Sequence, residues 1–263
     1  MNTPIVLIQA RMGSTRFPGK VLKPILEKPM LWHIVRRVRF ARGLSDVVVA
    51  TSDRVEDEVI RTFCHKQGIN VFAGSETDVL DRFYRAALVY HGDPVLRVTA
   101  DCPLIDPELI ERLLGLYASG SYDHVSVATG AGALFLDGGR YPNGLDAECF
   151  SFASLEQAWS QATESSDREH VTPYIWRIPD RFRCYMLKSQ IDYSHLRWTV
   201  DYEDDYLMVT RLYEELYREE APFLYREIVD YLERHPDLGL LNQAHIGQEG
   251  YARVWRPGGS ERK

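Results

Sequence analysis

The sequence lacks several features that define common classes of protein. No apolar run approaches the ~20 residues that a membrane-spanning helix needs, and no charged leader with a cleavage site precedes the first apolar stretch. The four cysteines, Cys64, Cys102, Cys149 and Cys184, form no C-x-x-C pair, which argues against a zinc ribbon and against a disulfide framework. These absences predict a soluble protein of the cytoplasm.

The chain also has fewer basic than acidic residues. Lysine and arginine number 31 against 38 aspartates and glutamates, so the formal net charge is -7. A nucleic acid or an anionic membrane surface would repel such a molecule as a whole, and we expect neither as a partner. Basic residues that nevertheless gather in one place are therefore informative.

The length and hydrophobic content are sufficient for one large core. The chain has 263 residues, of which 45% are hydrophobic, within the range of a single domain. No internal repeat or shift in composition marks a second one. We expect one domain over residues 1–256, followed by a flexible tail at 257–263.

Short apolar runs alternate with amphipathic segments, which is typical of βαβ units in a parallel sheet. The predicted strands are 5–9, 46–51, 69–73, 95–99, 124–128, 182–187 and 196–200. The predicted helices are 30–40, 55–67, 78–90, 107–117, 152–162, 169–176, 203–217 and 224–234. A glycine-rich stretch at 130–144 interrupts the rhythm, and we expect a long functional loop there.

The first strand is followed by the segment QARMGSTRFPGK at 9–20. Open α/β sheets bind ligands at the carboxyl ends of their strands, glycines let backbone N–H groups approach phosphate oxygens, and Arg11, Arg16 and Lys20 can neutralise a triphosphate. The segment is not a Walker A loop, because Val21 stands where a magnesium-binding Ser or Thr would be, and it lacks G-x-G-x-x-G. It predicts a nucleotide site that is neither an ATPase loop nor a dinucleotide site.

This loop resembles the signature loop of the SpsF-type spore-coat polysaccharide cytidylyltransferases and, more distantly, that of the Kdo and N-acylneuraminate cytidylyltransferases. Matching blocks continue in order: ATSD at 50–53, DVLDRF at 78–83, RVTADCPL at 97–104, REHVTPY at 168–174 and RWTVDYED at 197–204. The resemblance implies a Rossmann-like nucleotidyltransferase fold of the nucleotide-diphospho-sugar transferase type, with a mostly parallel sheet flanked by helices. It also implies transfer of CMP from CTP to an acidic sugar, a nonulosonate or 3-deoxy-sugar acid, with release of pyrophosphate, for surface polysaccharide biosynthesis.

Two aspartates end predicted apolar strands, Asp101 after 95–99 and Asp201 after 196–200. Nucleotidyl transfer spreads negative charge over the phosphoryl oxygens, and Mg²⁺ usually takes one or two ligands from protein carboxylates. The resemblance implies that both aspartates hold this cofactor, with Arg11 and Lys20 as further catalytic residues that steady the β- and γ-phosphates. Taken alone, each aspartate could be a helix cap.

The resemblance also assigns a set of residues to the nucleotide: Ala10, Arg11, Gly13, Ser14, Arg16, Lys20, Arg82 and Asp101. Arg82 is the candidate for a side-chain contact to the base. A solvated helix arginine is the alternative at that position.

Polar residues after the glycine-rich stretch predict the acceptor site within 130–190. The candidates are Asp146, Glu148, Arg168, Glu169 and His170. Arg168 or His170 could bind the acceptor's carboxylate, Asp146 and Glu148 could accept sugar hydroxyls, and Glu169 could equally be an ordinary first-turn helix residue. His170 is also a candidate general base, although a metal-bound alkoxide could serve as well. Relatives of this kind are commonly dimers, so the same region is a candidate dimer surface.

Two other functions compete with this interpretation. A glycosyltransferase that consumes a nucleotide sugar would share the cleft and the metal, but it normally shows a D-x-D motif, which is absent. A non-catalytic nucleotide-binding regulator would keep the cleft without turnover, and the intact set Arg11, Lys20, Asp101 and Asp201 argues against it. Hydrolase motifs such as G-x-S-x-G and H-E-x-x-H are also absent.

Overall fold

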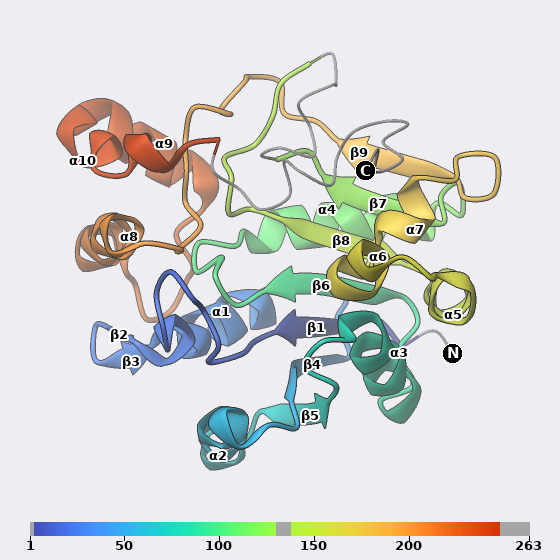
Figure 1. Ribbon diagram of the computed structural model, residues 1–263. Coiled ribbons are helices and arrows are strands. Elements are labelled where there is room, and N and C mark those ends of the chain that lie inside the picture. Colours follow the sequence, from blue (N-terminus) through green and yellow to red (C-terminus); the bar gives the residue numbers. More distant parts are fainter. Residues whose placement is uncertain (1–2, 130–137, 248–263) are drawn as a thin grey trace, which may run out of the picture.

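A computed structural model describes residues 3–129 and 138–247. One seven-stranded sheet crosses the molecule in the order β5-β4-β1-β6-β8-β7-β9 (Figure 1). Its strands are β1 (Ile5–Gln9), β4 (Asp46–Ser52), β5 (Asn70–Gly74), β6 (Val95–Thr99), β7 (His124–Val127), β8 (Ala147–Phe150) and β9 (Cys184–Leu187). Only β8 runs against the other six. The expected mostly parallel sheet is therefore confirmed.

Helices cover both faces of the sheet. Within β1, Val6 and Ile8 belong to one buried cluster and Ile5 and Leu7 to the other, as the period of two in a strand requires. Packed around the first cluster are α1 (Met30–Arg39), α2 (Glu58–Lys66), α4 (Pro107–Ala118), α8 (Glu203–Leu216) and α9 (Tyr225–Arg234). Packed around the second are α3 (Val79–Val89), α5 (Phe152–Gln161), α6 (Ser165–His170) and α7 (Pro173–Trp176).

Shorter elements complete the described chain. They are the two-stranded sheet of β2 (Pro24–Ile25) and β3 (Lys28–Pro29), the 3₁₀ turns η1 (Lys20–Leu22), η2 (Val55–Asp57) and η4 (Gln243–His245), and α10 (Pro236–Leu240). No helix in residues 3–129 or 138–247 is both long and apolar enough to cross a membrane. The predicted tail at 257–263 and residues 130–137 of the predicted loop lie outside the described residues.

Two sequence-based predictions were wrong. The predicted helix 169–176 is two short helices, α6 and α7, because Val171 adopts a positive φ of 73° and Pro173 has no N–H to continue the helix. The predicted strand 196–200 is extended but joins no ladder. Two of its N–H groups form separate hydrogen bonds to other loops. The Trp198 N–H donates to the Asn143 carbonyl at 2.6 Å, and the Val200 N–H donates to the Asp101 carbonyl at 2.8 Å. This segment therefore bridges two loops.

The sheet places three chain segments at one end of its parallel strands. Gln9 pairs in register with Thr99, so β1 and β6 end level and the segments after them start side by side. In Figure 1 the arrowheads of β1 and β6 point toward the side where α8, α9 and α10 gather. Asp201, just before α8, therefore lies close to Asp101, just after β6.

Candidate active site

The loop after β1 is fixed by its own hydrogen bonds and by one distant aspartate. The Met12 N–H donates to Asp57 Oδ1 at 2.7 Å, and the Phe17 N–H donates to Ser14 Oγ at 3.2 Å. Gly19 has a φ of 70°, in the left-handed region that favours glycine. This turn directs Lys20 into the protein, where only 7% of its surface is exposed. The sequence motif gave no sign that Asp57, 45 residues away, anchors the loop.

Lys20 lies between the two predicted metal-binding aspartates. Its Nζ is 3.1 Å from Asp101 Oδ2 and 2.8 Å from Asp201 Oδ1, and it donates to the Val200 carbonyl at 2.7 Å. Arg16 Nη2 is 2.9 Å from the other oxygen of Asp201. The structure therefore brings together residues from three separate segments of the chain around one group of charges.

The pKa values of Lys20 and Asp101 favour their charged states. Burial would lower the pKa of Lys20, but the carboxylates of Asp101 and Asp201 outweigh it and hold that pKa above its usual value. Burial would raise the pKa of Asp101, yet Lys20 keeps it below its usual range. The ammonium and the Asp101 carboxylate therefore both stay ionised at neutral pH.

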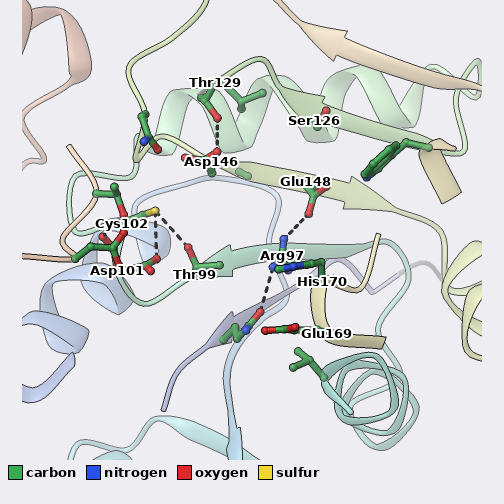
Figure 2. A pocket seen from close by; sticks show the side chains of 18 of the residues that line it. Arg97, Thr99, Asp101, Cys102, Ser126, Thr129, Asp146, Glu148, Glu169 and His170 are labelled. Carbon is green, nitrogen blue, oxygen red and sulfur yellow. Dashed lines mark hydrogen bonds and ion pairs between the residues drawn. The ribbon is translucent and has the colours of Figure 1, made fainter. Parts of the chain in front are cut away.

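A cavity of about 540 Å³ opens beside these charges. Arg11, Arg16, Asp101 and Asp201 line one end of it, and the wall continues over the sheet to His170. Figure 2 shows Asp101 and His170 at opposite ends of this lining. The volume is within the range of sites for small molecules. The cavity therefore suits a small-molecule ligand.

Charged side chains form the floor of the cavity over the sheet. Arg97 on β6 faces its cross-strand partner Glu148 on β8, with Nη1 2.8 Å from Oε2 (Figure 2). His124 Nε2 lies 3.2 Å from Glu148 Oε1, and Thr172 Oγ1 donates to the same oxygen at 2.7 Å. Arg97 Nη2 also donates to Gln9 Oε1 at 3.2 Å. The Glu148 carboxylate thus joins two cations.

Residues 5–233 match the sequence model of the cytidylyltransferase family. The chain belongs to that family. It is 32% identical over 251 residues to the spore coat polysaccharide biosynthesis protein SpsF of Bacillus subtilis, covering 93% of this chain and 100% of that protein. It is 40% identical over 114 residues to the 8-amino-3,8-dideoxy-manno-octulosonate cytidylyltransferase of Shewanella sp., covering 43% of this chain and 46% of that protein.

A solved cytidylyltransferase structure agrees with the fold. The structure from Leptospira borgpetersenii superposes with a TM-score of 0.81 at 29% identity and covers 90% of this chain and 97% of that one. The chain is accordingly a nucleotidyltransferase that uses CTP. The family and fold expected from the sequence motifs are confirmed.

The carboxylates of this cytidylyltransferase suit a metal ion that is shared with a nucleotide. In residues 3–129 and 138–247, no three His, Cys, Asp or Glu side chains are grouped so that they could hold an ion by themselves. Asp101 and Asp201 provide two carboxylates at the cavity wall, and Mg²⁺ takes its remaining ligands from water and phosphate. The residues present therefore fit magnesium that binds together with a triphosphate.

Arg82 is not the solvated helix arginine that the sequence left as an alternative, because none of its surface is exposed. Its Nη1 donates to the Ser75 carbonyl, whereas Nε and Nη2 have no partner among the described residues. Burial, with a smaller contribution from Arg11, lowers the pKa of Arg82 to about 10. Buried N–H groups without partners are uncommon. They are what a ligand carbonyl would satisfy.

Other loop residues in the nucleotide prediction have different surroundings. Ala10 is buried, and its N–H continues the sheet by donating to the Ala50 carbonyl at 3.2 Å. At Gly13, an added Cβ would meet only Glu76, at 3.8 Å, so space is not what requires glycine there. Any requirement at Gly13 would come from a close approach of the ligand.

The predicted acceptor residues divide into two groups. Asp146, Glu148, Glu169 and His170 line the cavity. Arg168 does not. Its guanidinium is bound to Asp78 at the start of α3 and to the Trp159 carbonyl, at 3.0 and 2.6 Å. These bonds tie α6 to α3 and α5, and the assignment of Arg168 to the acceptor stays a prediction.

The cations that face the cavity over the sheet are Arg97 and His124. Sequence reasoning missed both. A charged residue inside the apolar run Val95–Thr99 was the available signal for Arg97, because a buried charge needs a partner or a function. His124 carried no such signal, since it stands at the first position of a strand.

His124 is expected to make stability depend on pH. Burial would lower its pKa, but Cys184 and Glu148 raise it from 6.5 to about 9. The folded state therefore holds this proton more tightly than the unfolded chain does. The resulting stabilisation is complete below pH 6.5 and is lost as the pH rises through 9. A shift of this size corresponds to about 3 kcal/mol in the free energy of unfolding.

Urea unfolding of the wild type and of His124→Gln between pH 6 and 10 measures this effect. The wild type should lose stability across that interval, and the difference between the two proteins should shrink as the pH rises. A difference that stays constant with pH would show that folding does not shift the pKa of His124.

Proposed function

We propose that this cytidylyltransferase transfers the CMP moiety of CTP to a sugar acid and releases pyrophosphate, in the synthesis of surface polysaccharide. The observation that carries the proposal is the position of the Lys20 ammonium, within 3.1 Å of both Asp101 and Asp201 at the wall of the cavity. The names of the Bacillus and Shewanella relatives support polysaccharide synthesis and an octulosonate-type acceptor.

The loop end of the cavity suits the triphosphate. Arg11 and Arg16 line it, and Lys20 contacts the Asp201 carboxylate, as Arg16 does. These cations would bind the β- and γ-phosphates, improve pyrophosphate as a leaving group and align the α-phosphorus for in-line attack. The Gly13 N–H and the Ser14 hydroxyl would add contacts to the nucleotide. Arg82, with two buried donors free among the described residues, would contact the base.

The aspartates would hold magnesium. Bound there with CTP, the ion would offset negative charge that develops on the phosphoryl oxygens. Lys20 contacts the same two carboxylates, so its ammonium and the ion compete for the Asp101 and Asp201 oxygens. We propose that Lys20 turns from the aspartates to the phosphates when the nucleotide binds.

The sheet end of the cavity suits a hydroxylated acid. Arg97 and His124 would attract the acceptor's carboxylate, and Glu148 and Asp146 would accept hydrogen bonds from its hydroxyl groups. Burial, with the nearby Arg97, lowers the pKa of His170 below its usual value. A neutral imidazole at neutral pH can take a proton from the attacking hydroxyl. His170 therefore remains our candidate for the general base.

The proposed reaction is tested with CTP, ATP, GTP and UTP, each with Mg²⁺ and a panel of sugar acids that includes 3-deoxy-octulosonates and nonulosonates. We expect pyrophosphate release with CTP to exceed that with the other nucleotides by at least about 100-fold, because buried donors reject a mismatched base. Mass spectrometry should find the acceptor joined to CMP. Release with ATP or GTP but not with CTP would contradict the base assignment.

The predicted homodimer, its surface within 130–190 and the cytoplasmic location remain predictions.

A further inference from the structure

A buried aspartate lies behind the proposed metal site. Asp205, in the first turn of α8, has no exposed surface. The Asp201 and Tyr202 N–H groups donate to its Oδ2 at 2.9 and 3.0 Å. Arg197 Nε and Asn242 Nδ2 each lie 2.9 Å from its Oδ1, and Arg197 Nη2 lies 3.0 Å from Oδ2. Five donors therefore converge on one carboxylate.

This arrangement exceeds what the start of a helix needs. A capping carboxylate has to accept only from the first backbone N–H groups, and Asp205 does so through Asp201 and Tyr202. The additional Arg197 and Asn242 are themselves buried, at 2% exposure each. Burying an ionised pair costs free energy that a cap alone would not require. A second role is therefore needed to account for the charges.

The second role is visible in the contacts of Arg197. Its Nη2 reaches Asp201 Oδ2 at 3.2 Å as well as Asp205. Asp205 thus binds the backbone of Asp201 directly and its side chain through Arg197. Asn242 fixes the same arginine from the far end of the chain, because its Nδ2 donates to the Arg197 carbonyl at 2.9 Å.

Charge balance gives the direction of the effect. Arg16, Lys20 and Arg197 all lie within 3.2 Å of an Asp201 oxygen. A divalent ion has to compete with these cations for the Asp201 oxygens. Asp205 accepts two hydrogen bonds from Arg197. These bonds weaken the ion pair between Arg197 and Asp201. Without the Asp205 charge, Arg197 would turn its full charge toward Asp201 and weaken metal binding.

We propose that Asp205 is a positioning residue that, with Arg197 and Asn242, orients Asp201 and keeps its carboxylate available to a divalent cation. This inference rests on the proposed function, because it assigns a role within the same metal site. It makes Asp205 matter for metal affinity although it does not line the cavity.

The test compares Asp205→Asn with the neighbouring Asp204→Asn, whose side chain is 60% exposed and faces His245. Electron paramagnetic resonance measures the Kd of Mn²⁺ for each protein in the presence of a non-hydrolysable CTP analogue, and a thermal scan gives the unfolding midpoint. We expect Asp205→Asn to raise this Kd by about 10- to 100-fold and Asp204→Asn to change it less than twofold.

Asn242→Ala keeps the inference testable if Asp205→Asn does not fold. It removes a neutral partner of Arg197 and Asp205 and should raise the Kd for Mn²⁺ severalfold. The inference is overturned if every folded variant binds Mn²⁺ with a Kd within twofold of the wild type and only the unfolding midpoint falls. The network of Asp205, Arg197 and Asn242 would then serve stability alone. Failure of the wild type itself to bind Mn²⁺ with the analogue would instead overturn the proposed function.

Discussion

Replacement of Lys20 by methionine is expected to lower the kcat for CTP by about 10²- to 10³-fold, the usual loss when one preorganised charge contact to a transition state is removed. Methionine keeps most of the buried alkyl volume and removes the ammonium. The substitution also leaves Asp101 and Asp201 without the cation that lies within 3.1 Å of both. Their repulsion should lower the unfolding midpoint, so turnover has to be measured well below that temperature.

The same variant separates the two contacts proposed for Lys20. If the ammonium and the metal compete for the aspartates, Lys20→Met should bind Mn²⁺ more tightly than the wild type when no nucleotide is present. Lys66→Met is the matched control, because Lys66 is exposed in the last turn of α2. If the Lys20→Met enzyme retains the wild-type kcat, Lys20 has no role in the reaction.

The sequence was most informative where local chemistry and strand periodicity coincide. The strands β1 and β6 were predicted with the boundaries that the structure shows, because each is a short apolar run buried on both faces. The loop after β1 was found from its glycines and cations. Its anchor Asp57 was not, since a bond from Met12 to a residue 45 positions away leaves no local pattern.

The acceptor end of the cavity was less predictable, because it depends on which strands become neighbours. β8 was not predicted at all. Its four residues follow the polar run PNGLD at 142–146 and include the charged Glu148, so no apolar run marked a strand there. Its antiparallel pairing with β6 and β7 sets Glu148 between Arg97 and His124. Sequence spacing could not show that contact, nor the contact of the Arg168 guanidinium with Asp78.

The support behind Asp201 shows a different limit. Asp205 follows Asp201 by four residues and lies within the predicted helix 203–217, where no motif singled it out. Its partner Asn242 is 37 residues further on, in a segment with no recognised motif. The resemblance to the family singles out Asp201 as a candidate metal ligand. The residues that orient it become visible only in three dimensions.

A double-mutant cycle on Asp101 and Asp201 tests most directly whether the two carboxylates act together on one ion. Each of Asp101→Asn and Asp201→Asn is expected to lower kcat by about 10³-fold, which corresponds to about 4 kcal/mol. Asp230→Asn, at an exposed position on α9, should leave kcat unchanged.

Residues that serve one ion lose their function together, so the double variant should be little worse than the poorer single variant. Losses that multiply toward about 10⁶-fold would mean that the aspartates act independently. Such a result, or full activity in either single variant, would contradict a shared magnesium and triphosphate site.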